Sequence, residues 1–115
     1  MGEPGSFVMS EISIRTEILD GRLMLVRLSG IFEGMVAAEA EAPLLDILKK
    51  AKLPQVWIDF SEIDYIDSSA IGVLINLTKA AIALKTQVSI YKPNENIKKV
   101  ISVTHVDRLI PIVEG

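Results

Sequence analysis

Two adjacent serines, Ser68 and Ser69, follow an aspartate where a predicted strand, residues 56–60, leads into a predicted helix, residues 69–84. The first backbone N–H groups of a helix have no partner within it, and together with the helix dipole they favour an anion or another acceptor. Local chemistry alone favours a helix cap at Asp67 or Ser68, because both residue types are preferred caps. The alternative, which needs further support, is that Ser68 accepts a phosphoryl group.

The residues before Ser68 are rich in carboxylates. They include Asp59, Glu62, Asp64 and Asp67. Such oxygen-rich clusters can hold a divalent cation. We favour solvated turn residues over a metal site, because a loop of unspecified shape would have to gather these side chains, and we predict no cofactor. The only histidine, His105, has no visible catalytic partner and is expected to be structural.

Composition excludes several classes of function. The chain has 115 residues, which suits one domain, and half of them are hydrophobic, so a folded core is expected. Its formal net charge is −3 and no basic cluster is present, which argues against direct binding to nucleic acid. Without cysteine there are no disulfides or thiol chemistry. No apolar run is long enough to cross a membrane, so we expect a cytoplasmic protein.

The elements around Ser68 belong to an alternating pattern of strands and helices. Residues 11–18 alternate polar and apolar, and the Asp20-Gly21 turn joins them to a second strand in a hairpin. A helix should follow, with a kink or a new start at Pro43. The predicted elements are strands 11–18, 23–28, 56–60, 87–91 and 109–113, and helices 34–51, 69–84 and one that begins near Asn94.

This order predicts an α/β fold with a mixed sheet of four to five strands and helices mainly on one face. The last strand contains Pro111 and suits an edge of the sheet. We expect one domain over residues 9–115, preceded by a leader, residues 1–8, that is flexible or was added for expression.

The helix after Ser68 is apolar on nearly every side. One face, which we assign to the sheet, carries Ile71, Leu74, Ile75, Thr78 and Ile82. A second face carries Val73, Leu77, Ala80 and Leu84. Either a neighbouring helix buries this second face, or it is an exposed patch for a partner beside Ser68, and periodicity does not decide between the two.

The run Asp67–Leu74, which reads Asp-Ser-Ser-Ala-Ile-Gly-Val-Leu, resembles the signature of the bacterial anti-sigma factor antagonists of the STAS domain family. The preceding residues 63–66 and the stretch Leu28-Ser29-Gly30 support the resemblance. Ala70 departs from the family's usual glycine, and a helix should tolerate that change. Glu33 stands where the family usually has aspartate.

The resemblance implies a binding protein and no enzyme. In its unphosphorylated state such a protein sequesters an anti-sigma factor serine kinase, and phosphorylation of Ser68 releases the kinase, which regulates sigma-factor-dependent transcription. A serine phosphatase acting on phospho-Ser68 would reset the switch, and Ser69 is the competing acceptor. Together with the apolar second face, the resemblance predicts these partner-binding residues: Glu33, Asp67, Ser69, Gly72, Val73 and Leu77.

Two other functions stay open. One is a STAS scaffold without a switch, or an accessory subunit of a signalling or transport complex. The other is a small serine hydrolase, which the absence of a Gly-x-Ser-x-Gly motif and the single histidine make the weakest of the three. Because the apolar face could pair with itself, the predicted oligomeric state is a monomer or a weak homodimer.

Overall fold

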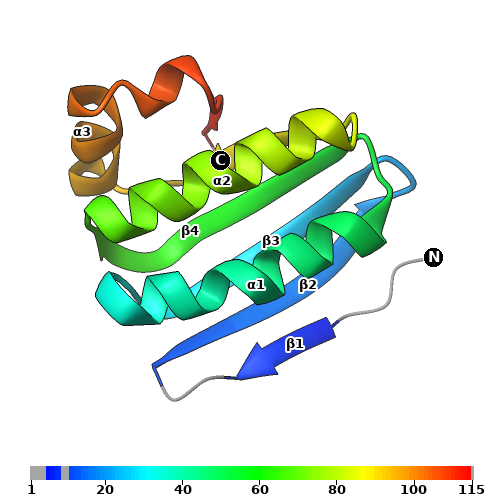
Figure 1. Cartoon of the computed structure of the whole chain (residues 1–115), viewed down its shortest axis with the longest axis horizontal. Coiled ribbons are helices and arrows are strands. Elements are labelled where there is room, and N and C mark those ends of the chain that lie inside the picture. The colour runs from blue at the N-terminus through cyan, green and yellow to red at the C-terminus, as the bar shows by residue number, and fades with distance from the viewer. Residues whose placement is uncertain (1–4, 9–10, 115) are drawn as a thin grey trace.

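A single mixed sheet organises the molecule (Figure 1). The computed structural model describes residues 5–8 and 11–114, with side chains for 11–114. The strands are β1 (Gly5–Val8), β2 (Ile12–Asp20), β3 (Leu23–Phe32), β4 (Gln55–Ile66), β5 (Gln87–Tyr91) and β6 (Ile112–Val113). They lie side by side in chain order; β1, β2 and β3 pair antiparallel, and β3 to β6 pair parallel.

The α/β class and the mixed sheet are confirmed, but the predicted strand count and leader are partly wrong. Residues 5–8 form β1, which pairs with β2 from Gly5↔Thr16 to Val8↔Ser13. Local sequence rules did not predict this strand, because it forms by pairing with a separate strand. The outer edge of β2 has backbone N–H and C=O groups that are free to form hydrogen bonds with another strand. The domain therefore begins before residue 9, and residues 1–4 lie outside the described part of the chain.

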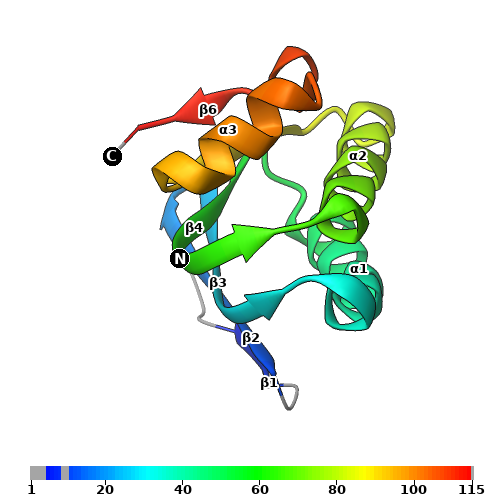
Figure 2. The ribbon, with the colours of Figure 1, turned by 90° about the vertical axis from the view of Figure 1, so that its left-hand side faces the viewer.

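The helices are α1 (Gly34–Ala51), α2 (Ser68–Ala83) and α3 (Glu95–Val103), with a 3₁₀ turn η1 at Val106–Arg108. Figures 1 and 2 show α1 and α2 side by side over one face of the sheet, as predicted, whereas α3 lies apart from them near the end of β4. The main core fills the space between the sheet and the helices α1 and α2. It includes Ile14, Val26, Leu28, Leu44, Ile58, Leu74 and Ile90.

The helix α1 runs unbroken through Pro43, so the predicted new start does not occur. Proline at this position removes one backbone hydrogen bond, to the carbonyl of Glu39. Glu39 is exposed, so water can satisfy that carbonyl. Packing of the buried face, with Ala40 on one side of Pro43 and Leu44 on the other, keeps the helix continuous.

The strand β4 is longer than predicted and carries the chain directly to Ser68. We expected a loop after Phe60, but pairing with β3 continues through Ser29↔Glu62, Gly30↔Ile63 and Phe32↔Ile66, with two register shifts. Buried Ile63 and Ile66 anchor this extension. Gly30 is required there, since its φ is +111° and a Cβ would collide with the Glu11 carbonyl oxygen.

Candidate functional site at the start of helices α1 and α2

Asp67 holds the first turns of two helices together. One of its carboxylate oxygens, Oδ1, accepts a hydrogen bond from the N–H of Ala70 at 3.0 Å, which caps α2. The other, Oδ2, accepts from the N–H of Gly34 at 2.9 Å, at the first residue of α1. The predicted cap is confirmed. The second bond could not be foreseen locally, because Gly34 is 33 residues away in the sequence.

Both serines occupy the first positions of α2 with their side chains exposed. Within the described residues, neither hydroxyl forms a hydrogen bond. The N-terminus of α1 lies beside them through the Asp67 contact, so two positive helix ends meet next to Ser68. The site can therefore receive an anionic group and leaves both hydroxyls accessible for modification.

Glu33 and Gly72 lie at the margins of this site. Glu33 is the residue before Gly34, is half-buried, and makes no capping bond with its side chain. Gly72 is on the second turn of α2, and apart from the backbone of that turn and the two adjacent residues, no described heavy atom would lie within 4 Å of a Cβ placed there. Packing within the domain therefore does not require glycine at position 72.

Val73 and Leu77 are wrong as partner-contacting residues. Their side chains are only 3% and 0% exposed, because the second face of α2 packs against α1. Leu77 lies beside Leu44 and Leu48 of α1. A neighbouring helix, one of our two alternatives, thus covers Val73 and Leu77, whereas Ala80 is half-buried and Leu84 is 41% exposed. On the sheet-facing side, Ile71, Leu74 and Thr78 are buried as predicted, but Ile82 is exposed.

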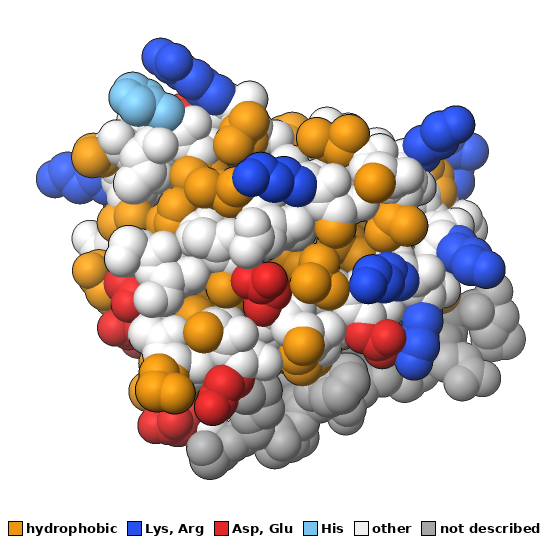
Figure 3. Space-filling view, in the orientation of Figure 1, with side chains coloured by type: hydrophobic (Ala, Val, Ile, Leu, Met, Phe, Trp, Pro, Cys, Tyr) orange, Lys and Arg blue, Asp and Glu red, His pale blue; other side chains and the backbone are white. Residues whose placement is uncertain are grey.

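Three exposed apolar side chains near Ser68 were missed by the sequence analysis. Ile31, Met35 and Tyr65 are 45%, 76% and 50% exposed, at the end of β3, the first turn of α1 and the end of β4. Figure 3 shows acidic and hydrophobic side chains beside one another where α1 begins, whereas lysine and arginine gather at the other end of that helix. The signal that identifies these residues is the exposure of several large apolar side chains at one end of the domain. That exposure is known only once the fold is known.

The carboxylates preceding Ser68 are separated by the extension of β4. In the described part of the chain, no three acidic or histidine side chains are placed to hold a metal ion. Asp59 is buried and pairs with Arg27 of β3 at 3.1 Å, on the sheet face away from α1 and α2. Burial alone would raise the pKa of Asp59, but hydrogen bonds from Ser61 and Arg27 outweigh it and lower the pKa below its ordinary value.

The sequence profile of the STAS domain family matches residues 13–114. The chain therefore belongs to the STAS domain family. Over 60 residues it is 28% identical to a candidate anti-sigma factor antagonist of Thermotoga maritima, a stretch that covers 52% of this chain and 53% of that protein. The chain spans about half the length of the curated relatives it matches.

Solved structures share the fold. An anti-sigma factor antagonist from Mycobacterium paratuberculosis superimposes with a TM-score of 0.77 at 19% identity, over 91% of this chain and 87% of that one. The antagonist SpoIIAA in its unphosphorylated form gives 0.73 at 14% identity, over 89% and 87%. The murine anion transporter Slc26a9 gives 0.69 at 14% identity, over 93% of this chain but 18% of the transporter.

Among the described helices, none combines the length and the apolar character needed to cross a membrane.

Proposed function

We propose that this protein is an anti-sigma factor antagonist whose binding is switched by phosphorylation of Ser68. The observation that carries the proposal is an exposed serine beside two helix N-termini joined by Asp67, in a STAS chain with an antagonist-like signature. Its partner is a cytoplasmic anti-sigma factor that is also a serine kinase, and a serine phosphatase restores the free hydroxyl. The protein itself has no catalytic role.

Electrostatics gives the switch its direction. A phosphate adds about −1.5 to −2 charge at neutral pH. In the free domain, water and the two helix N-termini stabilise this charge. Under a docked partner the phosphate would lose its water beside the Asp67 carboxylate, and residues 34–41 and 68–75, which begin α1 and α2, contain no lysine or arginine. Phosphorylation should therefore weaken binding while it changes the fold little.

The partner-contacting surface combines predicted and newly found residues. Glu33, Ser69 and the exposed apolar residues Ile31, Met35 and Tyr65 belong to the ends of β3 and β4 and the starts of α1 and α2, the same end of the domain as Ser68. Such apolar residues with a polar rim are typical of interface centres. Gly72 would let a partner approach the α2 backbone closely. Because Val73 and Leu77 of the second face are buried, little of that face is left for a homodimer interface, and we propose a monomer.

The test is a binding and phosphorylation assay with the anti-sigma kinase and ATP. The wild type and Ser68→Ala should form a complex, Ser68→Asp should bind at least tenfold more weakly, and fragment mass spectrometry should find one phosphoryl group on Ser68 of the wild type. Ser69→Ala is the matched control and should still be phosphorylated. Phosphate on Ser69 alone, or equal binding by the wild type and Ser68→Asp, would refute the proposal.

A second function is favoured by one observation, the presence of the same fold as a part of the anion transporter Slc26a9. In that case the chain would act as a non-switching scaffold or accessory subunit. A complex whose affinity is unchanged by every substitution at Ser68 would identify this second function.

A further inference from the structure

The outer edge of the strand β5 is only half covered. The strand β6 has two residues, and it pairs only with Ile90 and Tyr91 of β5. The first part of β5, residues 87–89, pairs with β4 on its inner side, and no described strand pairs with its outer side. A stretch of open strand edge therefore lies beside the place where the chain enters β6.

The free backbone groups of this edge belong to Val88. Along a strand, successive residues direct their N–H and C=O groups to opposite sides. The N–H of Gln87 donates toward β4, to the Pro54 carbonyl at 2.9 Å. The N–H of Ile90 donates the other way, to the Pro111 carbonyl at 2.8 Å. Val88 directs its groups to the same side as Ile90, and no described residue pairs with them there.

The segment before β6 does not close this gap. The N–H of Ile110 donates to the Val106 carbonyl at 2.9 Å, and Pro111 has no N–H. Neither residue can therefore donate to the Val88 carbonyl. Val88 is only 3% exposed, and an unpaired backbone group that is shielded from water costs free energy. A segment that pairs with Val88 would remove this cost.

A hollow of about 230 Å³ lies against the open edge, between α2, the start of β5 and the segment that leads into β6. None of its lining residues is charged, and the apolar ones are Ala81, Ile82, Val88, Leu109 and Pro111. The side chains of Ile82 and Leu109 are 71% and 54% exposed. Figure 3 shows hydrophobic side chains along the C-terminal half of α2. Large exposed apolar residues beside an open strand edge are typical of a contact surface.

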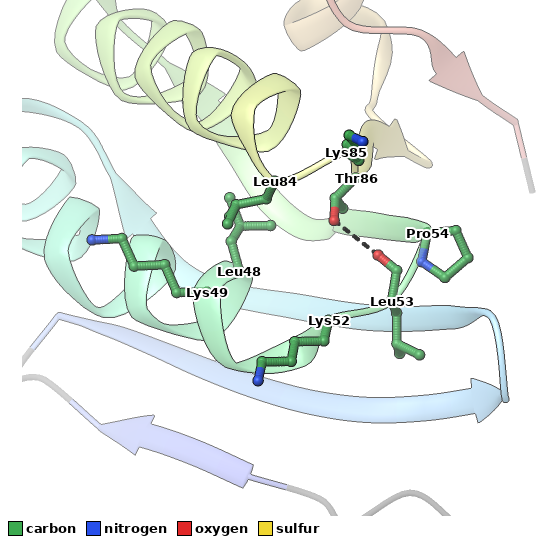
Figure 4. Close-up of a pocket in the computed structure, with 8 residues that line it drawn as sticks. All are labelled: Leu48, Lys49, Lys52, Leu53, Pro54, Leu84, Lys85 and Thr86. Carbon is green, nitrogen blue, oxygen red and sulfur yellow. Dashed lines mark hydrogen bonds between the residues drawn. The ribbon is translucent and has the colours of Figure 1, made fainter.

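The open edge is preformed. The Thr86 hydroxyl donates to the Leu53 carbonyl at 2.9 Å, which ties the start of β5 to the connection between α1 and β4 (Figure 4). The N–H of Thr86 donates to the Ala81 carbonyl of α2, also at 2.9 Å. These two bonds fix the entry to β5, so a ligand would not have to order it.

We propose that this edge binds a short extended peptide segment of a partner protein, by addition of a strand. The peptide backbone pairs with Val88, and one apolar side chain enters the hollow between Ile82 and Leu109. Residues 78–92, which supply most of the lining, contain three lysines and no acidic residue. Acidic residues that flank the apolar side chain in the peptide complement this charge.

The experiment uses the peptide acetyl-Glu-Val-Ile-Val-Glu-amide, titrated into the isotope-labelled full chain and followed by NMR. The peptide should shift the amide resonances of Val88 and Ser89. In the free protein, the N–H of Val88 should exchange with solvent about tenfold faster than that of Ile90, and the peptide should slow it. The same peptide with N-methylated backbone amides keeps its side chains but cannot pair as a strand, and it should bind about tenfold more weakly.

Substitutions on the two sides of the hollow test the site from the protein. Replacing Ile82→Ser and Leu109→Ser together should weaken binding of the peptide about tenfold. Since both side chains are exposed, the melting temperature should change little. Val103→Ser is the matched control, because Val103 is 72% exposed on α3 and lies outside the lining. Ser68→Asp, at the other end of α2, should also bind the peptide as the wild type does.

Four outcomes would overturn the proposal. They are the absence of peptide-induced shifts, equal binding of the N-methylated peptide, wild-type affinity of the double variant, and exchange of the Val88 N–H as slow as that of Ile90 in the free protein. None of them bears on the Ser68 switch, because the assay contains no kinase.

Discussion

At the scale of single residues, Asp67 should contribute to stability through both of its oxygens. Asp67→Ala removes the bonds to Ala70 and Gly34, and we expect it to lower the free energy of unfolding by about 2 kcal/mol. Asp67→Asn keeps one acceptor oxygen and should cost about half as much. Urea unfolding of the three proteins measures this order. Equal stability of Asp67→Ala and wild type would mean that the two hydrogen bonds accepted by Asp67 contribute nothing to stability.

Gly72 separates stability from binding. Glycine inside a helix costs about 1 kcal/mol relative to alanine, and a Cβ at this position meets open space. Gly72→Ala should therefore raise the free energy of unfolding by about 1 kcal/mol while it weakens binding of the proposed kinase partner. Thermal unfolding and titration of the partner measure the two effects. Unchanged affinity would remove Gly72 from the proposed interface.

At the scale of elements, the faces of α1 and α2 have distinct roles. Leu77→Ala opens a cavity between these helices and should cost about 2–5 kcal/mol. Met35→Ala, on the exposed first turn of α1, should change stability by less than about 0.5 kcal/mol. It should nevertheless weaken partner binding. Chemical unfolding and titration of the partner compare the two variants, and a stable, fully folded Leu77→Ala would contradict the packing.

The strands β3 and β4 are joined by a pH-sensitive pair, Arg27 and Asp59. The pKa of Asp59 is lower in the folded state, so its stabilising effect is complete above about pH 4 and is lost as pH falls through the folded value. Arg27 keeps 37% of its exposure, and we expect Asp59→Asn to cost only about 1–2 kcal/mol at neutral pH. Unfolding free energies across pH should show this difference shrinking on acidification; a constant difference would contradict the assignment.

At the scale of the whole molecule, the two ends of the α1–α2 layer differ in charge. Glu33, Glu62 and Asp64 lie toward the Ser68 end, and Lys49, Lys52 and Lys85 lie toward the other. A partner that docks at Ser68 should therefore present basic residues, and its association rate should fall roughly tenfold from low to physiological salt. Stopped-flow mixing measures this rate. A rate independent of salt would indicate a purely apolar contact.

Sequence patterns alone predict the α/β class, the order of most elements, a cap at Asp67 or Ser68, and the position of Ser68 at a helix start. Capping, turn chemistry and hydrophobic periodicity act over a few residues, so they can be read directly. The same local rules misjudged residues 5–8 and residues 61–66, because strand pairing in a sheet depends on distant partners.

Which faces of the helices are covered depends on long-range packing, which sequence patterns do not reveal. Val73 and Leu77 satisfy the pattern of an apolar patch equally well whether α1 or a partner buries them, and periodicity does not distinguish the two. The contact of Asp67 with Gly34 likewise joins residues that are more than 30 positions apart. Such contacts exist only once the sheet has brought α1 and α2 side by side.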